Sequence, residues 1–215
     1  MIEQFSKIFD GLQAAYGTYK INGRDTKGKA TGKATVVKES RTTETWEAHL
    51  SGQQSIGIIP INEDNECKWG CIDIDEYNFD HQKLLKQLQN AKLPLVVCRS
   101  KSGGAHVFLF TAEFIPAKDM QETLKRLAVS LGYGSCEIFP KQIVLHLERG
   151  DVGNFLNTPY FDHENGLRYA FKADGTAATI EEFFELHEQN VQTHEQVLAL
   201  TVEEDPDLPL KDGPP

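Results

Sequence analysis

The stretch KWGCIDIDEYNFDHQKLLKQLQNAKLPLVVCRSKSGGAHVFLF, residues 68–110, decides the fold of this chain. Its first apolar run predicts a strand that reaches Asp75, and the periodic spacing after it predicts a helix from about Asp80 to Asn90. The runs Leu93 to Arg99 and His106 to Phe110, separated by a Gly-Gly turn, predict two further strands.

The residues after Phe110 complete this unit. A helix is predicted from about Ala117 to Leu131, and a strand from Cys136 to Phe139. The resulting order, βαββαβ, is that of the ferredoxin-like or RNA-recognition-motif (RRM-like) arrangement. We therefore expect an α+β fold in which an RRM-like (ferredoxin-like) module packs on a smaller N-terminal α/β module.

The flanking residues divide into three further regions. The first 62 residues are predicted to hold an amphipathic helix, strands and a second helix over the segments Ile2 to Ala15, Tyr16 to Ile21, Ala34 to Val37, Thr43 to Leu50 and Ser55 to Ile61. Later segments predict two more strands and an acidic helical region, at Ile143 to Leu147, Leu167 to Phe171 and Ile180 to Leu200. The expected organisation is 1–62, 63–175, 176–202, and a disordered linker or tail at 203–215.

Composition indicates a globular protein without a membrane segment. The chain has 215 residues, of which 40% are hydrophobic, enough for one substantial core or two small modules. It has no run of about 18 apolar residues and no signal-peptide pattern, so we expect a cytoplasmic protein. Three of its four cysteines lie in or beside apolar strand-like runs and are expected to be reduced core thiols; Cys67-x3-Cys71 also allows a zinc interpretation, although no second ligand pair follows nearby.

Charge is distributed unevenly. Residues 174–215 hold eleven acids and one lysine, which accounts for the whole net charge of −10. Residues 20–41 instead hold seven basic side chains and two acids, net +5, in a Gly- and Thr-rich context. This basic loop is either a contact for a phosphate backbone or a solvated hairpin.

The predicted topology gathers polar residues at one edge of the sheet. Helices reverse the chain between strands, so the first two strands end where the last two begin. Residues up to 64 positions apart are therefore expected to converge there: Asp73, Asp75, Arg99, Ser102, His106 and Glu137.

Asp73 and Asp75 are the candidate metal ligands. Two positions apart on a strand, they face one side, with Ile72 and Ile74 directed into the core. Paired carboxylates in an apolar run need a compensating positive charge, and hard oxygen ligands suit Mg²⁺ or Mn²⁺. The alternative is a strand end whose acids emerge into water.

The segment RSKSGGAH, residues 99–106, is the candidate phosphate-binding loop. Arg99, Ser102, the amide of Gly104 and His106 together offer the donors that a triphosphate requires. A plain Gly-Gly hairpin turn and a structural histidine are the alternatives.

Four short motifs in order carry a family resemblance. CIDID at 71–75, SKSGGAH at 100–106, EIFPKQ at 137–142 and GNFLNTP at 153–159 resemble motifs of the archaeo-eukaryotic primase superfamily, which includes primase-polymerases. The last two are similar to the primase branch of bacterial conflict systems and of phage and plasmid replication proteins. The resemblance covers roughly residues 5–160 and implies an archaeo-eukaryotic primase fold.

The resemblance also implies roles for single residues. Asp73, Asp75 and Glu137 would be catalytic and would hold Mg²⁺ or Mn²⁺, while Ser102 and His106 would contact the nucleotide phosphates. Lys141 would add a cation, and Asn154 would lie near the sugar or phosphates. The alternatives are that Glu137 and Lys141 are surface residues and that Asn154 caps a turn.

The expected function is that of a DNA-dependent primase-polymerase. It would join a ribo- or deoxyribonucleotide to a 3′-hydroxyl on a single-stranded DNA template with its primer, and a helicase or accessory domain is a further expected partner. Two alternatives remain, a non-catalytic RRM-like nucleic-acid-binding module and a metal-dependent nuclease. The first would need Phe108 and Phe110 exposed on the middle strands.

Overall fold

The structure, a computed structural model, describes residues 1–24 and 30–202, and the side chains of residues 20–32 are not described. Residues 25–29 of the basic loop, Lys27 and Lys29 among them, therefore lie outside the described residues. The predicted tail at 203–215 also lies outside them.

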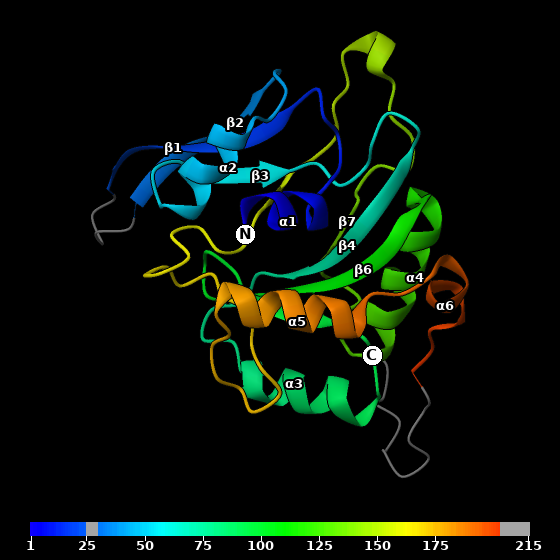
Figure 1. Cartoon of the computed structure of the whole chain (residues 1–215). Helices are drawn as coiled ribbons and strands as arrows, with labels where there is room; N and C mark the ends of the chain where they lie inside the picture. The colour runs from blue at the N-terminus through cyan, green and yellow to red at the C-terminus, as the bar shows by residue number, and fades with distance from the viewer. Residues whose placement is uncertain (25–29, 203–215) are drawn as a thin grey trace, which may run out of the picture.

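The predicted βαββαβ unit forms the larger part of the fold (Figure 1). Its strands are β4 (Glu66–Ile74), β5 (Val96–Arg99), β6 (Ala105–Pro116) and β7 (Glu137–Phe139). They form one sheet in the order β5-β6-β4-β7, and every neighbouring pair is antiparallel. Thus β4 and β5 run one way and β6 and β7 run back, which confirms the ferredoxin-like prediction.

Two helices connect these strands and cover one face of the sheet. They are α3 (His81–Asn90) and α4 (Ala117–Ser130). The carboxylate of Asp80 caps α3 by accepting a hydrogen bond from Lys83 N at 3.0 Å. Ile72 and Ile74 point into the core on this side, as the alternation along β4 predicted.

A second four-stranded sheet belongs to the N-terminal module. It has the order β2-β1-β3-β8. Its strands are β1 (Tyr16–Arg24), β2 (Ala30–Val37), β3 (Ile56–Ile58) and β8 (Leu156–Asn157). Helices α1 (Ile2–Ile8) and α2 (Thr43–Leu50) belong to the same region. Strand β8 follows the ferredoxin-like unit in the chain, so one edge strand of this sheet comes from beyond position 62.

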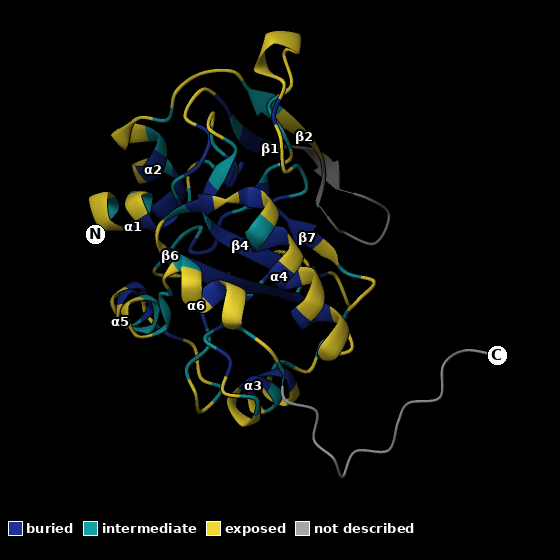
Figure 2. Ribbon diagram, turned by 90° about the vertical axis from the view of Figure 1, so that its right-hand side faces the viewer, coloured by how far each residue is buried: buried dark blue, intermediate teal, exposed yellow. Residues whose placement is uncertain are grey.

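The two sheets enclose an aromatic core. Phe9, the C-cap residue of α1, contacts Trp69 of β4 and Phe108 and Phe110 of β6, with ring centroids 5.4–5.7 Å apart. Helix α5 (Ile180–Asn190) adds Phe183, whose ring stacks on Phe9 at 5.9 Å. Figure 2 shows the buried interior running between the strands and helices. This face of the ferredoxin-like sheet is therefore covered by segments from both ends of the chain.

Three predicted elements differ from the observed ones. The helix predicted for Ile2 to Ala15 ends at Ile8, because residues from Gly11 pack against the backbone of Ile59 instead. Ile143 to Leu147 is not a strand: Ile143 and Val144 are exposed, and a 3-10 turn, Leu147–Arg149, comes next. Leu167 to Phe171 is not a strand: it forms two isolated bridges, Ala170 to Cys98 along the outer edge of β5 and Phe171 to Ala177.

The cysteines are free thiols, as expected. Burial raises the pKa of the Cys67, Cys71 and Cys98 thiols well above the ordinary range. A β-bulge between Cys67 and Trp69 turns Cys67 toward the α3–α4 core, whereas Cys71 lies in the aromatic core. The two sulfurs therefore face opposite sides of the sheet, which removes the zinc interpretation of Cys67-x3-Cys71.

The acidic C-terminal region contains two helices where one stretch was expected. The second, α6 (His194–Ala199), packs on α4, and Val197 is fully buried there. Over the described residues, no helix is both long and apolar enough to cross a membrane.

Candidate active site

Three of the predicted site residues lie in one row across adjacent strands. In the ladder, Asp73 of β4 is paired with His106 of β6 on one side and with Glu137 of β7 on the other. Directly paired residues project to the same face of a sheet, with Cβ atoms roughly 4.5–5.5 Å apart. The register thus sets a histidine and two carboxylates side by side.

This row lies at the end of the aromatic core. His106 is followed along the same face of β6 by Phe108 and Phe110, and Asp73 is preceded along β4 by Cys71 and Trp69. The side chain of His106 is 7% exposed and that of Asp73 is 22% exposed, and Nε2 of His106 lies 3.4 Å from Oδ1 of Asp73. The histidine is therefore held from below by the core and directed at the carboxylate.

The loop between β5 and β6 reaches the second aspartate. Ser102 Oγ lies 2.6 Å from Asp75 Oδ1 and donates to it, and Ser100 Oγ lies 3.1 Å from Ser102 Oγ. The turn closes with Gly103 N donating to Ser100 O at 3.2 Å. Asp75 follows the last residue of β4 and is exposed, so its carboxylate is oriented by the loop rather than by the sheet.

Gly104 is required for this close approach. A Cβ atom at Gly104 would lie 2.0 Å from the carbonyl oxygen of Ile74, closer than real Cβ atoms come to backbone. Gly103 has φ of +96°, a conformation that L side chains rarely adopt. The Gly-Gly pair thus lets the loop lie against the end of β4, where both aspartates are.

Glu137 is paired with the lysine four positions later. Lys141 Nζ lies 2.7 Å from Glu137 Oε2; the two side chains are 30% and 62% exposed. The backbone at Lys141 is itself held, because Gln121 Nε2 of α4 donates to its carbonyl at 2.9 Å. Lys141 therefore lies beside the row on the β7 side.

Arg99 and Asn154 lie less centrally than the other predicted residues. Arg99 ends β5, and its Nη1 donates to Leu167 O at 3.4 Å. Asn154 is bonded to Gln142, which donates from Nε2 to Asn154 Oδ1 at 2.5 Å and accepts from Asn154 N at 3.0 Å. Asn154 is linked to the row only through Gln142, the neighbour of Lys141.

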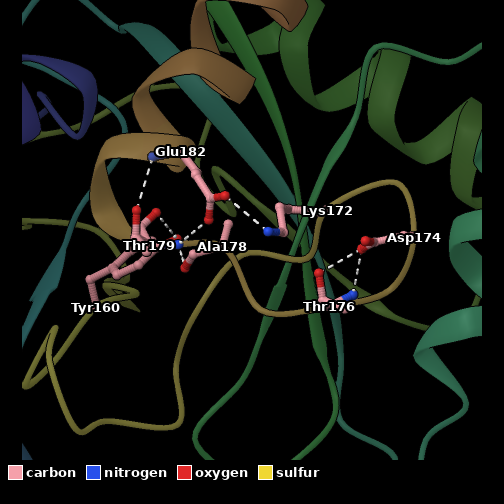
Figure 3. A network of polar contacts seen from close by, with 7 residues as sticks. All are labelled: Tyr160, Lys172, Asp174, Thr176, Ala178, Thr179 and Glu182. Atoms are coloured by element: carbon pink, nitrogen blue, oxygen red, sulfur yellow. Dashed lines mark hydrogen bonds and ion pairs between the residues drawn. The ribbon is translucent and has the colours of Figure 1, made fainter.

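Two contacts at the site were missed by sequence reasoning. Lys101 Nζ lies 3.0 Å from the ring centroid of Tyr19, which joins the loop 99–106 to β1 of the N-terminal sheet. Tyr160, with a left-handed φ of 59°, accepts a hydrogen bond from Ala170 N at 3.1 Å. Its hydroxyl donates to Ala178 O at 3.0 Å (Figure 3). The sequence around Lys101 and Tyr160 does not predict these contacts. Tyr19 is distant from Lys101 in the chain, and the partners of Tyr160 are backbone atoms.

The Tyr160 network fixes the edge beside Arg99. Ala170, which Tyr160 holds, forms the bridge to Cys98 of β5, and Arg99 N donates to Tyr169 O at 2.8 Å. Figure 3 also shows Lys172 paired with Glu182 of α5 at 2.9 Å. The edge of β5 that does not pair with β6 is thus covered by the segment around Tyr169 and Ala170, which is anchored to α5.

The exposed aromatic platform of an RNA-recognition module is missing. Phe108 and Phe110 are fully buried beneath α1 and α5. Trp69 is buried as well, and its Nε1 donates to Asp10 O at 2.8 Å. Bases cannot stack on these rings, so the feature on which that alternative depended is absent.

The chemistry of the carboxylates suits a divalent cation, but each acid has a partner within the chain. Asp73 faces His106, Asp75 accepts from Ser102, and Glu137 pairs with Lys141. In the described parts of the chain, no three Asp, Glu, His or Cys side chains are grouped closely enough to hold a metal ion. Each of the three carboxylates is therefore already in contact with a protein donor.

Comparisons with known proteins agree with the motifs. The profile of the family described as "TOTE conflict system, Archaeo-Eukaryotic Primase domain" matches residues 6–199. No curated protein sequence matches the chain. Similar solved structures include the archaeo-eukaryotic primase domain of the cyanophage S-2L primase-polymerase, with a TM-score of 0.44 and 10% identity over 92% of this chain and 94% of that one.

The catalytic domain of primase RepB′ in complex with initiator DNA is also similar, with a TM-score of 0.38 and 11% identity over 87% of this chain and 92% of that one. These two likenesses are too distant to carry an argument by themselves. The family profile covers most of the chain, including every predicted site residue. This chain therefore belongs to the archaeo-eukaryotic primase domain family of TOTE conflict systems.

Proposed function

We propose that this chain is a DNA-dependent primase-polymerase core that transfers a nucleotide from a nucleoside triphosphate to a 3′-hydroxyl. Membership of a primase domain family supports nucleotidyl transfer in general. The observation that carries the proposal is the in-register row of His106, Asp73 and Glu137, with Ser102 reaching Asp75 from the adjoining loop. A single-stranded DNA template with its primer, and a joined or associated helicase, are the proposed partners.

Asp73, Asp75 and Glu137 are the residues that would hold Mg²⁺ or Mn²⁺. When bound, the cation supplies charge neutralisation at the triphosphate and lowers the pKa of the attacking hydroxyl. For Asp75 and Glu137 to turn toward it, Ser102 and Lys141 must release their present contacts. Both released groups are donors, and each is then available to an anionic substrate.

The loop 99–106 would hold the triphosphate. The Ser102 hydroxyl, the backbone amides of the Gly-Gly turn and the His106 ring lie next to Asp73 and Asp75, and Arg99 ends the strand that leads into the turn. The 3′-hydroxyl oxygen forms a bond to the α-phosphorus, the α–β phosphoanhydride bond breaks, pyrophosphate leaves, and the hydroxyl proton passes to solvent. The protein chiefly positions the substrates and neutralises the negative charge that develops on them.

Nucleotide incorporation on a primed DNA template tests this proposal. The wild-type chain should extend the primer with Mg²⁺ or Mn²⁺, and parallel reactions with ribo- and deoxyribonucleotides report its sugar preference. Asp73→Asn with Asp75→Asn should lower incorporation by about a thousandfold or more, because metal and phosphate positioning supply most of the rate. Asp64→Asn with Asp151→Asn makes the same charge change at exposed positions and should retain activity.

A second readout separates loss of chemistry from loss of folding. Metal together with nucleotide should raise the melting temperature of the wild type and of the control, but not that of the Asp73 and Asp75 double variant. Primer degradation instead of extension would establish the nuclease alternative. Template binding without either reaction would favour a non-catalytic binding module.

A further inference from the structure

His81, the first residue of α3, reaches the loop 99–106 from the helix. Its ring Nε2 lies 3.0 Å from Gly104 O, and because a carbonyl oxygen only accepts, this nitrogen carries the proton and donates. The same oxygen accepts from Ser100 N at 2.9 Å, a bond within the loop. The carbonyl of Gly104 is therefore held both by the loop itself and by a side chain from α3.

The imidazole of His81 is fixed by its own surroundings. Its centroid lies 4.6 Å from that of Phe171 and 5.2 Å from that of Phe79. Phe171 belongs to the segment along β5, and its backbone N donates to Val97 O at 2.8 Å. The cap by Asp80 fixes the first turn of α3, from which the ring projects. The donor is thus supported by a helix and by the edge of the sheet, which is how a precise contact is maintained.

A Gly-Gly turn gains more from such an outside partner than other loops do. Glycine has access to more backbone conformations than other residues, so the direction of its carbonyl is weakly determined by the chain itself. The hydroxyl of Ser102 and the amides of this turn must nevertheless face one point to hold a triphosphate. If only a fraction of molecules has the loop in that arrangement, the apparent affinity for nucleotide falls by the same fraction.

We infer that His81 is a positioning residue for nucleotide binding, which holds the loop 99–106 in its competent arrangement through the Gly104 carbonyl. The inference rests on the proposed function and adds to it a residue outside the predicted site. His81 acts on the loop and not on the substrate. Its donor is the feature that matters for affinity, whereas its ring matters for the packing of α3 against Phe171.

Two replacements separate the donor from the ring. His81→Phe retains aromatic packing and loses the donor, while His81→Gln retains an N–H donor at a similar reach and loses the ring. The loss of one hydrogen bond corresponds to a factor of about five in an equilibrium, so His81→Phe should raise the nucleotide dissociation constant about fivefold and His81→Gln less than about twofold. The melting temperatures should follow the opposite order, with His81→Gln the lower. A purely structural role would instead make weaker binding accompany lower stability.

Fluorescence titration of the full chain with N-methylanthraniloyl-labelled ATP and dATP in the presence of Mg²⁺ measures these constants without template or catalysis. His163→Phe, the same replacement in the loop after Tyr160, is the matched control and should leave them unchanged. An unchanged constant for His81→Phe, or an equal rise for His81→Phe and His81→Gln, overturns the inference. A wild-type chain that binds both probes but incorporates nothing retains the role of His81 and loses the proposed polymerase activity.

Hydrogen exchange tests the same contact in the absence of nucleotide. In His81→Phe the amides of Ser100 and Gly103, which donate within the loop, should exchange about fivefold faster than in the wild type, because the loop opens more often. The amides of β6 beyond the loop should be unaffected. Equal exchange of the loop amides in His81→Phe and the wild type overturns the inference, whatever the outcome of the incorporation assay.

Discussion

At the scale of single residues, His49 shows how a buried titratable group is made neutral by its surroundings. Its Nδ1 accepts from Ile56 N at 3.2 Å, so the proton is on Nε2, which donates to Pro159 O at 2.8 Å. Burial lowers the pKa of His49 to about 4. A second proton would place an N–H against the amide of Ile56, so the folded state excludes it.

His49 therefore predicts a loss of stability in mild acid. Its folded pKa lies below the ordinary value of about 6.5, so the unfolded chain takes up a proton first as pH falls between 6.5 and 4. The free energy of unfolding should fall in that window by roughly 1.4 kcal/mol per pH unit for this histidine. Urea unfolding at pH 7, 6 and 5 measures the slope.

The control for this prediction is His49→Gln, which retains a donor and an acceptor but does not titrate. The slope of the variant should be shallower than that of the wild type. His187, whose pKa burial also lowers to about 4, remains in both proteins and contributes equally to each. Equal slopes would mean that His49 titrates normally in the folded protein.

The acids of the candidate site, like His49, have specific partners in the folded chain. Asp73 and Glu137 lie in paired strands and Asp75 follows the end of β4, and each of the three carboxylates already has a protein partner. Sequence reasoning predicted that Asp73, Asp75 and Glu137 lie at one edge of the sheet, and the register pairs Asp73 with Glu137, but it did not predict these partners. The partners depend on loop geometry and rotamers, which no sequence period encodes.

At the scale of elements, the start of α5 joins the capping of a helix to the edge of the sheet. Thr179 Oγ1 accepts from Glu182 N at 3.2 Å, and Glu182 Oε2 accepts from Thr179 N at 2.8 Å. This capping box is built beside the hydroxyl of Tyr160, which also donates to Thr179 O at 3.2 Å. The helix start and the segment covering β5 are thus one connected structure.

Removing the Thr179 cap should therefore lower the free energy of unfolding more than removing the charge of Glu182. Thr179→Ala should lower the free energy of unfolding by about 1 kcal/mol, because the first turn loses its acceptor. Thr179→Ser should restore most of it. Glu182→Gln should cost less than Thr179→Ala, because the Lys172–Glu182 pair is more than one-third exposed on both sides and solvent screens it. Urea unfolding of the three variants checks this order, and a larger loss for Glu182→Gln would contradict it.

At the scale of the whole molecule, the segment after α5 is built into the main sheet. Gln192 N donates to Phe110 O at 3.0 Å, and Ala112 N donates to Gln192 O at 2.9 Å. Val197 of α6 is fully buried, and Arg126 Nη2 of α4 donates to Leu200 O at 3.1 Å. The segment 191–200 is therefore packed against the sheet and α4.

Two truncations separate the contribution of α6 to stability from that of residues 203–215. Removal of residues 203–215, which are acidic and proline-containing, should change the melting temperature by less than about 2 °C and leave nucleotide incorporation intact. Removal of residues 191–215 should lower it by about 5 °C or more, since burial of Val197 and the backbone bonds of Gln192 are lost with it. Differential scanning calorimetry measures both; similar melting temperatures for the two truncated chains would mean that α6 adds no stability.

The sequence by itself determined the βαββαβ order, the direction of the strands, and hence the edge at which Asp73, Asp75, Ser102, His106 and Glu137 lie. It could do so because hydrophobic period and Gly-Gly punctuation are local, and a helix between two strands fixes their relative direction. Tertiary structure alone decided that Asp73 is paired with both His106 and Glu137, since ladder register depends on contacts between strands distant in sequence. It also buried Phe108 and Phe110, because the helices that cover them, α1 and α5, come from opposite ends of the chain.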